Sequence, residues 1–389
     1  MKPRANDAGY EKLREATKIL PKSRYDSVVL MPAGRMGGAD LVAAILVRAL
    51  VKSKKVLILR TDDSHWDCPH WYPEDVDSID ISPYLKDIQN QHQGIPVRHR
   101  ALYVILTEIA APQIFNVNSR LAFETMVSYG AQLASQFKLY AYYFCADRTE
   151  NGSETGYPVL FFHNIFRYLD AAILDTKYLA NILENRFSLP LSETQRLKTI
   201  YTPAQVDAEQ LPVSERHKSE PDRSRPRILW GGRLDRQKRF DLVVQIARGM
   251  PDVDFLCWGK AVLDKAPSMK KAPENLHLNP PFKDYDELPL GDCDGWLYTS
   301  EWDGLPTILI ELGALGMPIA ASAVGGVPEL IDEETGWLVP ETASVDEYVA
   351  QIRAMIDDPE ARVSRGRALQ QRVRERHSMQ AFVDSIDSI

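Results

Sequence analysis

The chain has 389 residues and 44% of them are hydrophobic, so the sequence excludes a protein that is disordered over most of its length. At roughly 150 residues per domain, this length predicts two or three domains, of which two is the simpler arrangement. The formal net charge at pH 7 is -8, which argues against a generally basic nucleic-acid-binding protein, and we expect no nucleic-acid partner.

The start of the chain predicts neither an export signal nor a membrane span. Residues 1–20 are charged and lack the apolar core of a signal peptide, and residues 10–20 fit an amphipathic helix that packs on the protein body. The longest apolar stretch, residues 41–51, contains Arg48 and is too short to cross a bilayer. We therefore expect a cytoplasmic protein, and peripheral contact with the inner face of the membrane stays open.

The first half of the chain alternates short apolar runs with helix-length segments. The apolar runs that predict buried strands are residues 27–31, 55–59, 114–117, 139–145 and 171–174. The stretch 41–51 predicts a helix after the first of these strands, and residues 159–169 predict another helix further along. Strands separated by helices indicate a parallel sheet with helices on both faces.

A polar stretch divides the chain. Glu, Lys, Ser, Arg and Pro dominate residues 207–226, and we interpret residues 208–226 as a linker. The linker would separate a first domain, residues 1–207, from a second, residues 227–372. We expect the last stretch, residues 373–389, to form a C-terminal helix that packs back on the first domain.

The second half repeats the alternation. Strands are predicted at residues 228–230, 254–258, 295–298 and 319–322. Helices are predicted after Phe240, where apolar residues recur at helical spacing, and at residues 307–315, which Gly316 and Pro318 terminate. The sequence therefore predicts two doubly wound α/β domains, whose ligands would bind at the carboxyl ends of the strands.

One motif, Ser300 to Glu311, follows a predicted strand and opens a predicted helix. The first N–H groups of that helix have no intrahelical partners, and with the helix dipole they suit a phosphate. Gly304 would let the backbone approach closely, Asp303 could accept bonds from sugar hydroxyls, and Glu311 could reach ribose hydroxyls. The alternative is a capped core helix with a surface glutamate.

A second motif supplies cations. Arg233 follows Gly232 at a strand end, and Lys238 lies at the start of the next helix, so both side chains could converge on one oxyanion. Such a pair suits a diphosphate leaving group that is bound without a metal. The alternative is a solvated basic turn, because Arg236 and Arg239 are close in sequence.

Taken in order, these motifs resemble glycosyltransferase family 4, the retaining enzymes of the two-domain GT-B architecture. Further matching pieces are residues 314–320, 325–329 and 336–340. The resemblance is specific over about residues 228–340 and weaker over the N-terminal half. It implies an α/β GT-B fold in which two Rossmann-like domains face a cleft.

The resemblance also implies roles for single residues. Arg233 and Lys238 would hold the donor diphosphate, Asp303 would contact the donor sugar, and these three form the predicted catalytic set. This chain departs from the family at position 303, because the family has glutamate there; the shorter carboxylate would reach the sugar through a shifted loop or a water, and Glu301 could assist. The predicted donor-binding residues are Gly37, Gly38, Gly232, Gly304, Leu305, Pro306, Thr307 and Glu311.

The acceptor side is expected in the first domain. Residues 34–40 look like the family's first glycine loop, although a turn that needs positive φ would show the same pattern. Many family members end a later strand with a histidine; this chain has Asp147 after that strand, and we interpret His163 as a structural histidine. The aromatic and polar residues 65–72 suit either sugar stacking or a packed loop. The acceptor-side candidates are Arg35, His65 and Asp147.

We expect neither a metal nor a cofactor besides the nucleotide-sugar substrate. Asp292 and Asp294 imitate a pair of metal ligands, but they immediately precede a strand, where polar turn residues are usual. The four cysteines show no metal-ligand spacing and suit a reducing compartment.

The implied function is retaining transfer of a sugar from a UDP- or GDP-linked donor to a hydroxyl of a glycan or lipid-linked glycan, in surface polysaccharide biosynthesis. Expected partners are the donor, a glycan or glycolipid acceptor and other biosynthetic enzymes. Two alternatives stay open, a GT-B nucleotide-sugar epimerase and a non-catalytic subunit that binds nucleotide or glycan. A nicotinamide-dependent enzyme is disfavoured, because no complete Gly-x-Gly-x-x-Gly follows a strand.

Overall fold

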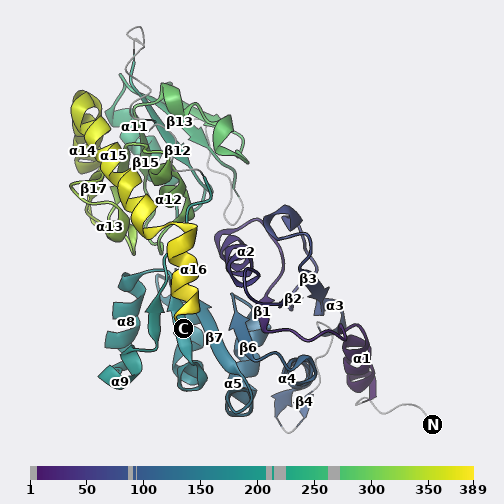
Figure 1. The fold of residues 1–389 in the computed structure, drawn as a ribbon. Helices are drawn as coiled ribbons and strands as arrows, with labels where there is room; N and C mark the ends of the chain where they lie inside the picture. The colour runs from purple at the N-terminus through teal and green to yellow at the C-terminus, as the bar shows by residue number, and fades with distance from the viewer. Residues whose placement is uncertain (1–6, 86–90, 93, 207–212, 214–224, 262–271) are drawn as a thin grey trace. The chain divides into compact units, whose positions relative to one another are not determined.

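The structure is a computed structural model that describes residues 7–85, 91–92, 94–206, 213, 225–261 and 272–389 (Figure 1). The chain divides into two compact units, one formed by Met1–Thr202 with Phe382–Ile389 and the other by Pro203–Ala381. None of the helices in the described part of the chain combines the length and the hydrophobicity that a membrane span needs. Most of the predicted linker, residues 208–226, lies outside the described residues. Within it, Val213 is buried and donates its N–H to the carbonyl of Leu315 at 2.8 Å.

The first unit is built on a parallel sheet with the strand order β11-β10-β7-β6-β1-β2-β3. Its strands are β1 (Ser27–Met31), β2 (Val56–Arg60), β3 (Asp77–Asp80), β6 (Gln113–Asn116), β7 (Lys138–Tyr143), β10 (Ala171–Leu174) and β11 (Leu197–Thr199). The interior strand β1 is buried at every position, which fits a strand with helices on both faces of its sheet. Val28 pairs with Leu57 on one side and with Ile114 on the other.

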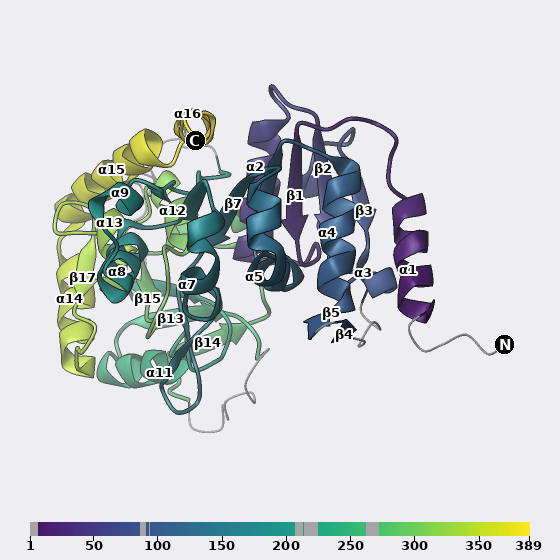
Figure 2. The same ribbon diagram turned by 90° about the horizontal axis from the view of Figure 1, so that it is seen from below.

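Helices flank this sheet, and α4 and α5 lie side by side (Figure 2). The helices are α1 (Asp7–Lys18), α2 (Gly38–Leu50), α3 (Ser82–Leu85), α4 (Val97–Ile109), α5 (Arg120–Ala134), α6 (Tyr157–Leu160), α7 (Phe162–Ile165), α8 (Lys177–Phe187) and α9 (Leu191–Thr194), with 3-10 turns η1 (Pro69–Trp71) and η2 (Phe166–Tyr168). Two small hairpins pair β4 (Gln91–His92) with β5 (Ile95–Pro96), and β8 (Asp147–Arg148) with β9 (Glu154–Thr155).

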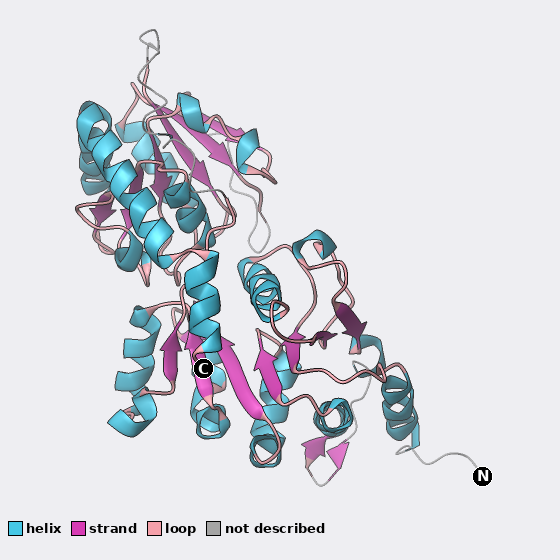
Figure 3. Ribbon diagram, viewed as in Figure 1, coloured by secondary structure: helices cyan, strands magenta, loops and turns pink. Residues whose placement is uncertain are grey.

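The second unit contains another parallel sheet, with the order β14-β13-β12-β15-β16-β17 (Figure 3). Its strands are β12 (Arg227–Gly231), β13 (Asp254–Trp258), β14 (Leu276–Asn279), β15 (Gly295–Tyr298), β16 (Ile319–Ser322) and β17 (Trp337–Val339). Its helices are α11 (Phe240–Gly249), α12 (Thr307–Ala314), α13 (Val327–Leu330), α14 (Val345–Asp357), α15 (Pro359–Arg376) and α16 (Met379–Asp387), with η5 (Tyr285–Glu287) and η6 (Leu290–Asp292). The last residues of α16, from Phe382, belong to the first unit.

The predicted α/β class and the parallel sheets are confirmed, and β10, β13, β15 and β16 have the predicted bounds. The helix predicted at residues 159–169 is wrong as one element, because the chain forms α6, α7 and η2 instead. Phe161, the residue between α6 and α7, has a φ of -122° instead of the helical value of about -63°, so it interrupts the helix.

Because every strand of each sheet runs parallel to its neighbours, all the carboxyl ends of a sheet meet at one edge. The loops after the strands, which carry the predicted site residues, therefore gather at that edge within each unit.

Candidate functional site

In the second unit, two loops leave the carboxyl ends of neighbouring strands. The loop after β12 carries Gly232, Arg233 and Lys238, and the loop after β15 carries Asp303 and leads into α12. Gln237 joins the two loops by hydrogen bonds. Its side-chain amide donates to the backbone carbonyl of Trp302 at 3.0 Å, and its backbone carbonyl accepts the N–H of Glu301 at 2.8 Å. The two motifs that the sequence singled out thus form one hydrogen-bonded surface.

Glycines let these loops approach closely. A Cβ at Gly259, the residue after β13, would lie 2.0 Å from the carbonyl oxygen of Gly232. Gly325, after β16, has a φ of +55°, and a Cβ there would lie 1.8 Å from the carbonyl oxygen of Asp303. A larger residue at Gly259 would push apart the loops after β12 and β13, and one at Gly325 would push apart the loops after β15 and β16.

Arg233 is partly exposed and is held by its own loop. Its Nε lies 3.0 Å from Oδ2 of Asp235, and its Nη2 donates to Oε1 of Gln237 at 2.5 Å. Asp235 is 7% exposed and also accepts the N–H of Lys238 at 3.1 Å. The guanidinium is therefore fixed at the strand end with part of its surface in solvent.

Lys238 and Asp303 meet in the structure. Nζ of Lys238 lies 2.5 Å from Oδ2 of Asp303, and the hydroxyl of Tyr298 donates to the same oxygen at 2.6 Å. The other carboxylate oxygen accepts the N–H of Gly304 at 3.0 Å. Burial alone would raise the pKa of Asp303, but the charge of Lys238 and these hydrogen bonds lower it below its ordinary value. The carboxylate of Asp303 is thus ionised, and both of its oxygens accept hydrogen bonds.

The N-terminus of α12 follows directly. Pro306 is the N-cap residue, and no side chain caps the helix. Gly304, Leu305 and Pro306 are buried, and Thr307 is partly exposed. A helix terminus of this kind offers unpaired N–H groups and a partial positive charge to an anion.

Glu311 lies on the second turn of α12 and is 4% exposed. Both of its carboxylate oxygens accept the N–H of Gln205, at 2.9 and 3.0 Å, and Oε2 also accepts the N–H of Val206 at 2.9 Å. The alternative of a surface glutamate on this helix is therefore wrong, because burial and these backbone amides hold the carboxylate inside the unit.

An apolar pocket of about 260 Å³ adjoins Arg233. Its walls include Gly232 and Arg233 from the loop after β12, Trp258 at the end of β13, Phe282, and Ile308 in the first turn of α12. Trp258, Phe282 and Tyr298 are not among the site residues predicted from the sequence. Trp258 and Tyr298 are the last residues of predicted strands, so the carboxyl-end rule could have indicated both.

In the first unit, Gly37 and Gly38 begin α2. Neither glycine has positive φ, so the alternative of a turn that requires it is wrong for this pair. A Cβ at Gly37 would meet only Oδ2 of Asp40, at 3.5 Å, and a Cβ at Gly38 would meet nothing within 4 Å. The space in front of this helix start is therefore open.

Arg35 and His65 come together around Asp63, in the loops after β1 and β2. Nη2 of Arg35 lies 2.6 Å from Oδ2 of Asp63, and Nδ1 of His65 lies 2.8 Å from Oδ1. Trp66 stacks on Tyr72 with ring centroids 4.8 Å apart. Arg35 and His65 are exposed. Tyr72 is 6% exposed and the Arg60 guanidinium lies 4.6 Å from the centroid of the Trp66 ring, so the aromatic pair fits the alternative of a packed loop.

Asp147 and His163 lie elsewhere in the first unit. Asp147 is exposed in the β8 hairpin, and it accepts the N–H of Arg148 at 2.8 Å. His163 is exposed on α7 and stacks on Phe187, with ring centroids 5.4 Å apart. The packing on Phe187 fits the structural role that the sequence analysis gave to His163.

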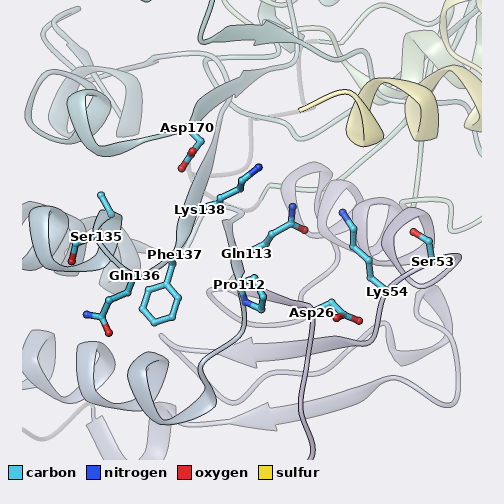
Figure 4. A pocket seen from close by; sticks show the side chains of 11 residues that line it. Asp26, Ser53, Lys54, Pro112, Gln113, Ser135, Gln136, Phe137, Lys138 and Asp170 are labelled. Carbon is cyan, nitrogen blue, oxygen red and sulfur yellow. The ribbon is translucent and has the colours of Figure 1, made fainter.

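A pocket of about 690 Å³ lies at the opposite edge of the first sheet, where β1, β6 and β7 begin (Figure 4). Asp26 and Asp170 line it, and they accept the N–H groups of Lys55 at 2.7 Å and Leu139 at 2.8 Å. These carboxylates hold the starts of strands. We interpret the pocket as part of the scaffold, because ligands of parallel sheets bind at the other edge.

Asp294, the second acid before β15, has a structural role. It accepts the N–H of Arg227 at 2.9 Å and lies 3.7 Å from Arg362. Over the part of the chain that the structure describes, no group of three or more His, Cys, Asp or Glu side chains could hold a metal.

Comparison with known proteins gives matches over parts of this chain. Residues 214–372 match the family model described as glycosyl transferases group 1. A curated relative, the "uncharacterized 41.2 kDa protein in cps region" of Klebsiella pneumoniae, is 28% identical over 37% of this chain and 41% of its own length. A second, the "putative colanic acid biosynthesis glycosyltransferase WcaL" of Escherichia coli K12, is 37% identical over 18% of this chain and 19% of its own. The matches thus span less than half of either relative.

Solved structures show the fold. HepE of Anabaena, in complex with UDP and glucose, matches with a TM-score of 0.71 and 15% identity over 94% of this chain and 99% of that chain. Sucrose-phosphate synthase of Thermosynechococcus elongatus matches with a TM-score of 0.69 and 18% identity, over 93% and 98% of the two chains. The fold is the GT-B type, with two Rossmann-like α/β domains in one chain. The group 1 match and this fold together support a glycosyltransferase.

Proposed function

We propose that the protein is a retaining glycosyltransferase that moves a sugar from a nucleoside-diphosphate donor to a hydroxyl of a glycan or lipid-linked glycan. One observation carries the proposal: Arg233, Lys238 and the uncapped N-terminus of α12 lie on joined loops at the carboxyl ends of β12 and β15. The glycosyl transferases group 1 match covers these residues.

The proposed chemistry depends on where negative charge develops during the reaction. As the bond between sugar and diphosphate breaks, negative charge develops on the β-phosphate. Arg233, Lys238 and the α12 N–H groups would stabilise it without a metal. The departing phosphate would accept the proton of the attacking hydroxyl, on the same face of the sugar, which gives retention at the anomeric carbon.

The pocket beside Arg233 would hold the nucleobase. Trp258, Phe282 and Ile308 give it apolar walls, which suit a flat heteroaromatic ring. HepE, which shares the fold, is described in complex with UDP, so UDP is the nucleotide to test first.

The acceptor would bind the first unit. Arg35 and His65 would supply exposed polar groups for a glycan, and Asp147 is a further candidate. The name of the WcaL relative points to polysaccharide biosynthesis. We place the protein in the cytoplasm, at the inner face of the membrane when the acceptor is lipid-linked, together with other enzymes of the same assembly.

A thermal-shift panel with UDP, GDP, dTDP and ADP tests the donor site. A nucleotide at one hundred times its dissociation constant should add about 2.7 kcal/mol to the free energy of unfolding of wild type. Arg233→Ala should lose this stabilisation, and Arg353→Ala, whose exposed ion pair with Asp252 lies outside the site, should keep it. If none of the nucleotides stabilises wild type, the donor assignment is wrong and a non-catalytic role becomes the better explanation.

A further inference from the structure

Another pocket of the second unit, with a volume of about 210 Å³, lies between the start of α11, residues 299–301 after β15, and the start of α14. It shares no lining residue with the apolar pocket beside Arg233. Because these segments all follow strands of one parallel sheet, the pocket lies at the carboxyl edge of the sheet. Ligands of parallel sheets bind at this edge.

This pocket touches both of the loops that carry the predicted catalytic set. Arg239 follows Lys238 directly and forms part of one wall, and Ser300, three residues before Asp303, forms part of another. The hydroxyl of Thr299, which also lines the pocket, donates to the carbonyl of Lys238 at 2.8 Å and joins the two walls. A molecule in the pocket would therefore contact both loops without entering the apolar pocket beside Arg233.

Arg239 has a backbone conformation that L side chains rarely adopt. Its φ is +52°, in the left-handed region that favours glycine, so the chain carries a conformational cost at this position. Its Nε and Nη2 donate to the carboxylate of Asp241 at 3.0 and 3.1 Å. Nη1 takes no part in these bonds, and a ligand in the pocket would bind it. A role in binding explains why an arginine stands where a glycine would be unstrained.

Ser300 brings a buried polar group to the same pocket. The residue is 2% exposed, and within the described part of the chain its Oγ has no hydrogen-bond partner. A buried hydroxyl without a partner costs free energy, and such a group in a native structure calls for an occupant that bonds to it. The wall at Ser300 is therefore suited to a polar ligand.

The remaining side chains of the lining identify the class of ligand. Glu301 and Glu341 offer carboxylate acceptors, Arg239 offers donors, and the amide of Gln245 offers both. A sugar hydroxyl both donates and accepts, so a monosaccharide can pair with each of these groups. Tyr348 is 3% exposed, and its ring supplies an apolar wall for the C–H face of a sugar. Two carboxylates beside one guanidinium disfavour a phosphate or another anion.

We propose that this pocket is a second carbohydrate site, which binds one neutral monosaccharide and thereby holds the loops of Lys238 and Asp303 together. The proposal goes beyond the donor site and does not depend on it, because the residues of the pocket are different.

Thermal shift and hydrogen–deuterium exchange of the full chain with D-glucose, D-galactose and D-mannose test the proposal. In wild type, one of these hexoses should raise the melting midpoint saturably, by about 3 °C at ten times its dissociation constant. It should also slow exchange at the amides of residues 240–245 and 299–301 several-fold. Ala343→Phe adds a ring to the wall of the pocket and should lose both effects. Thr342→Phe, at the exposed neighbouring position outside the lining, is the matched control and should keep them.

Arg239→Gly tests the same site without crowding it. Glycine adopts the positive φ without a Cβ, so this variant should stay folded even if Ala343→Phe does not. It should lose the effects of the hexose, because the guanidinium is gone. Arg233→Ala, which alters the proposed donor site, should keep the effects of the hexose.

Three outcomes would overturn the proposal. A shift that rises linearly with hexose concentration, and persists in Ala343→Phe and Arg239→Gly, would reflect exclusion of the sugar from the protein surface. A saturable shift that disappears in Arg233→Ala and persists in Ala343→Phe would place the sugar at the donor site instead. The absence of a saturable shift with all three hexoses would leave water as the occupant of the pocket.

Discussion

The carboxylate of Asp303 accepts hydrogen bonds from Lys238, from the hydroxyl of Tyr298 and from the N–H of Gly304. The family pattern has a glutamate here that contacts the donor sugar. The shorter side chain of Asp303 instead pairs with one of the two cations proposed for the diphosphate. Its negative charge would hold Lys238 in place before the donor arrives and oppose the diphosphate once it binds.

Asp303→Asn should therefore change UDP binding and kcat in opposite directions. The amide can still accept hydrogen bonds, but Lys238 is no longer neutralised, so UDP should bind more tightly. The rate kcat should fall by about a hundredfold, because Lys238 is no longer held where charge develops. Calorimetric titration with UDP and steady-state kinetics measure the two effects. Tyr298→Phe, which keeps the charge pair, is the matched control, and weaker UDP binding by Asp303→Asn would contradict the argument.

Asp40, in the first turn of α2, predicts a pH dependence. Burial, only partly offset by hydrogen bonds from backbone N–H groups, raises its pKa from 3.8 to about 6. Since the folded-state pKa lies above the unfolded one, the protonated form is favoured by folding, and this stabilisation is lost as pH rises through 6. Asp40→Asn should therefore be more stable than wild type at pH 8, by about 2 kcal/mol, and the difference should shrink at pH 5. Urea unfolding of both proteins at pH 5 and pH 8 measures the difference in stability. The same difference at both pH values would contradict the predicted pH dependence.

At the scale of elements, the site also depends on how closely its loops approach one another. The loops after β15 and β16 are joined by a bond from the N–H of Gly326 to the carbonyl of Gly304, at 2.9 Å. This bond places the chain before α12 against the loop that begins at Gly325.

Gly325→Ala should break this arrangement. The residue has positive φ, and the added methyl would overlap the carbonyl oxygen of Asp303. We expect a loss of about 2 kcal/mol or more in the free energy of unfolding, together with loss of UDP binding. Denaturant unfolding and thermal shift measure both. Gly291→Ala is the control, because a Cβ there meets nothing within 4 Å and should leave both quantities near wild type.

Sequence patterns were sufficient for the central strands and insufficient for the contacts between loops. β13 and β15 are short apolar runs with clear ends, so their bounds could be predicted. The edge strand β14, Leu276–Asn279, includes His277 and Asn279 and resembles a loop in composition. The partners of Glu311 lie more than a hundred residues earlier in the chain, and no local pattern relates a glutamate to backbone amides at that separation.

At the scale of the whole molecule, each unit has its own hydrophobic core, so unfolding need not be a single transition. Of the seven tryptophans, Trp66 and Trp71 belong to the first unit. The second unit contains Trp230, Trp258, Trp296, Trp302 and Trp337. Tryptophan fluorescence therefore reports mainly on the unit that carries the proposed donor site.

UDP should consequently raise the melting midpoint seen by tryptophan fluorescence more than the midpoint seen by far-ultraviolet circular dichroism, which averages over both units. Parallel melts with and without UDP make the comparison, and Arg233→Ala should abolish the difference. Equal shifts by both probes would mean that the units unfold as one.

The first unit is discontinuous in sequence, since Phe382–Ile389 belongs to it although the whole second unit intervenes. Phe382 and Ile386 are each 2% exposed, so they contribute to the packed interior. During synthesis, the ribosome completes the second unit before this piece of the first is made. The N-terminal unit is therefore the last to reach its full set of contacts. A nascent chain that stalls before Phe382 carries an incomplete first unit with uncovered apolar surface, which is the kind of species that chaperones bind.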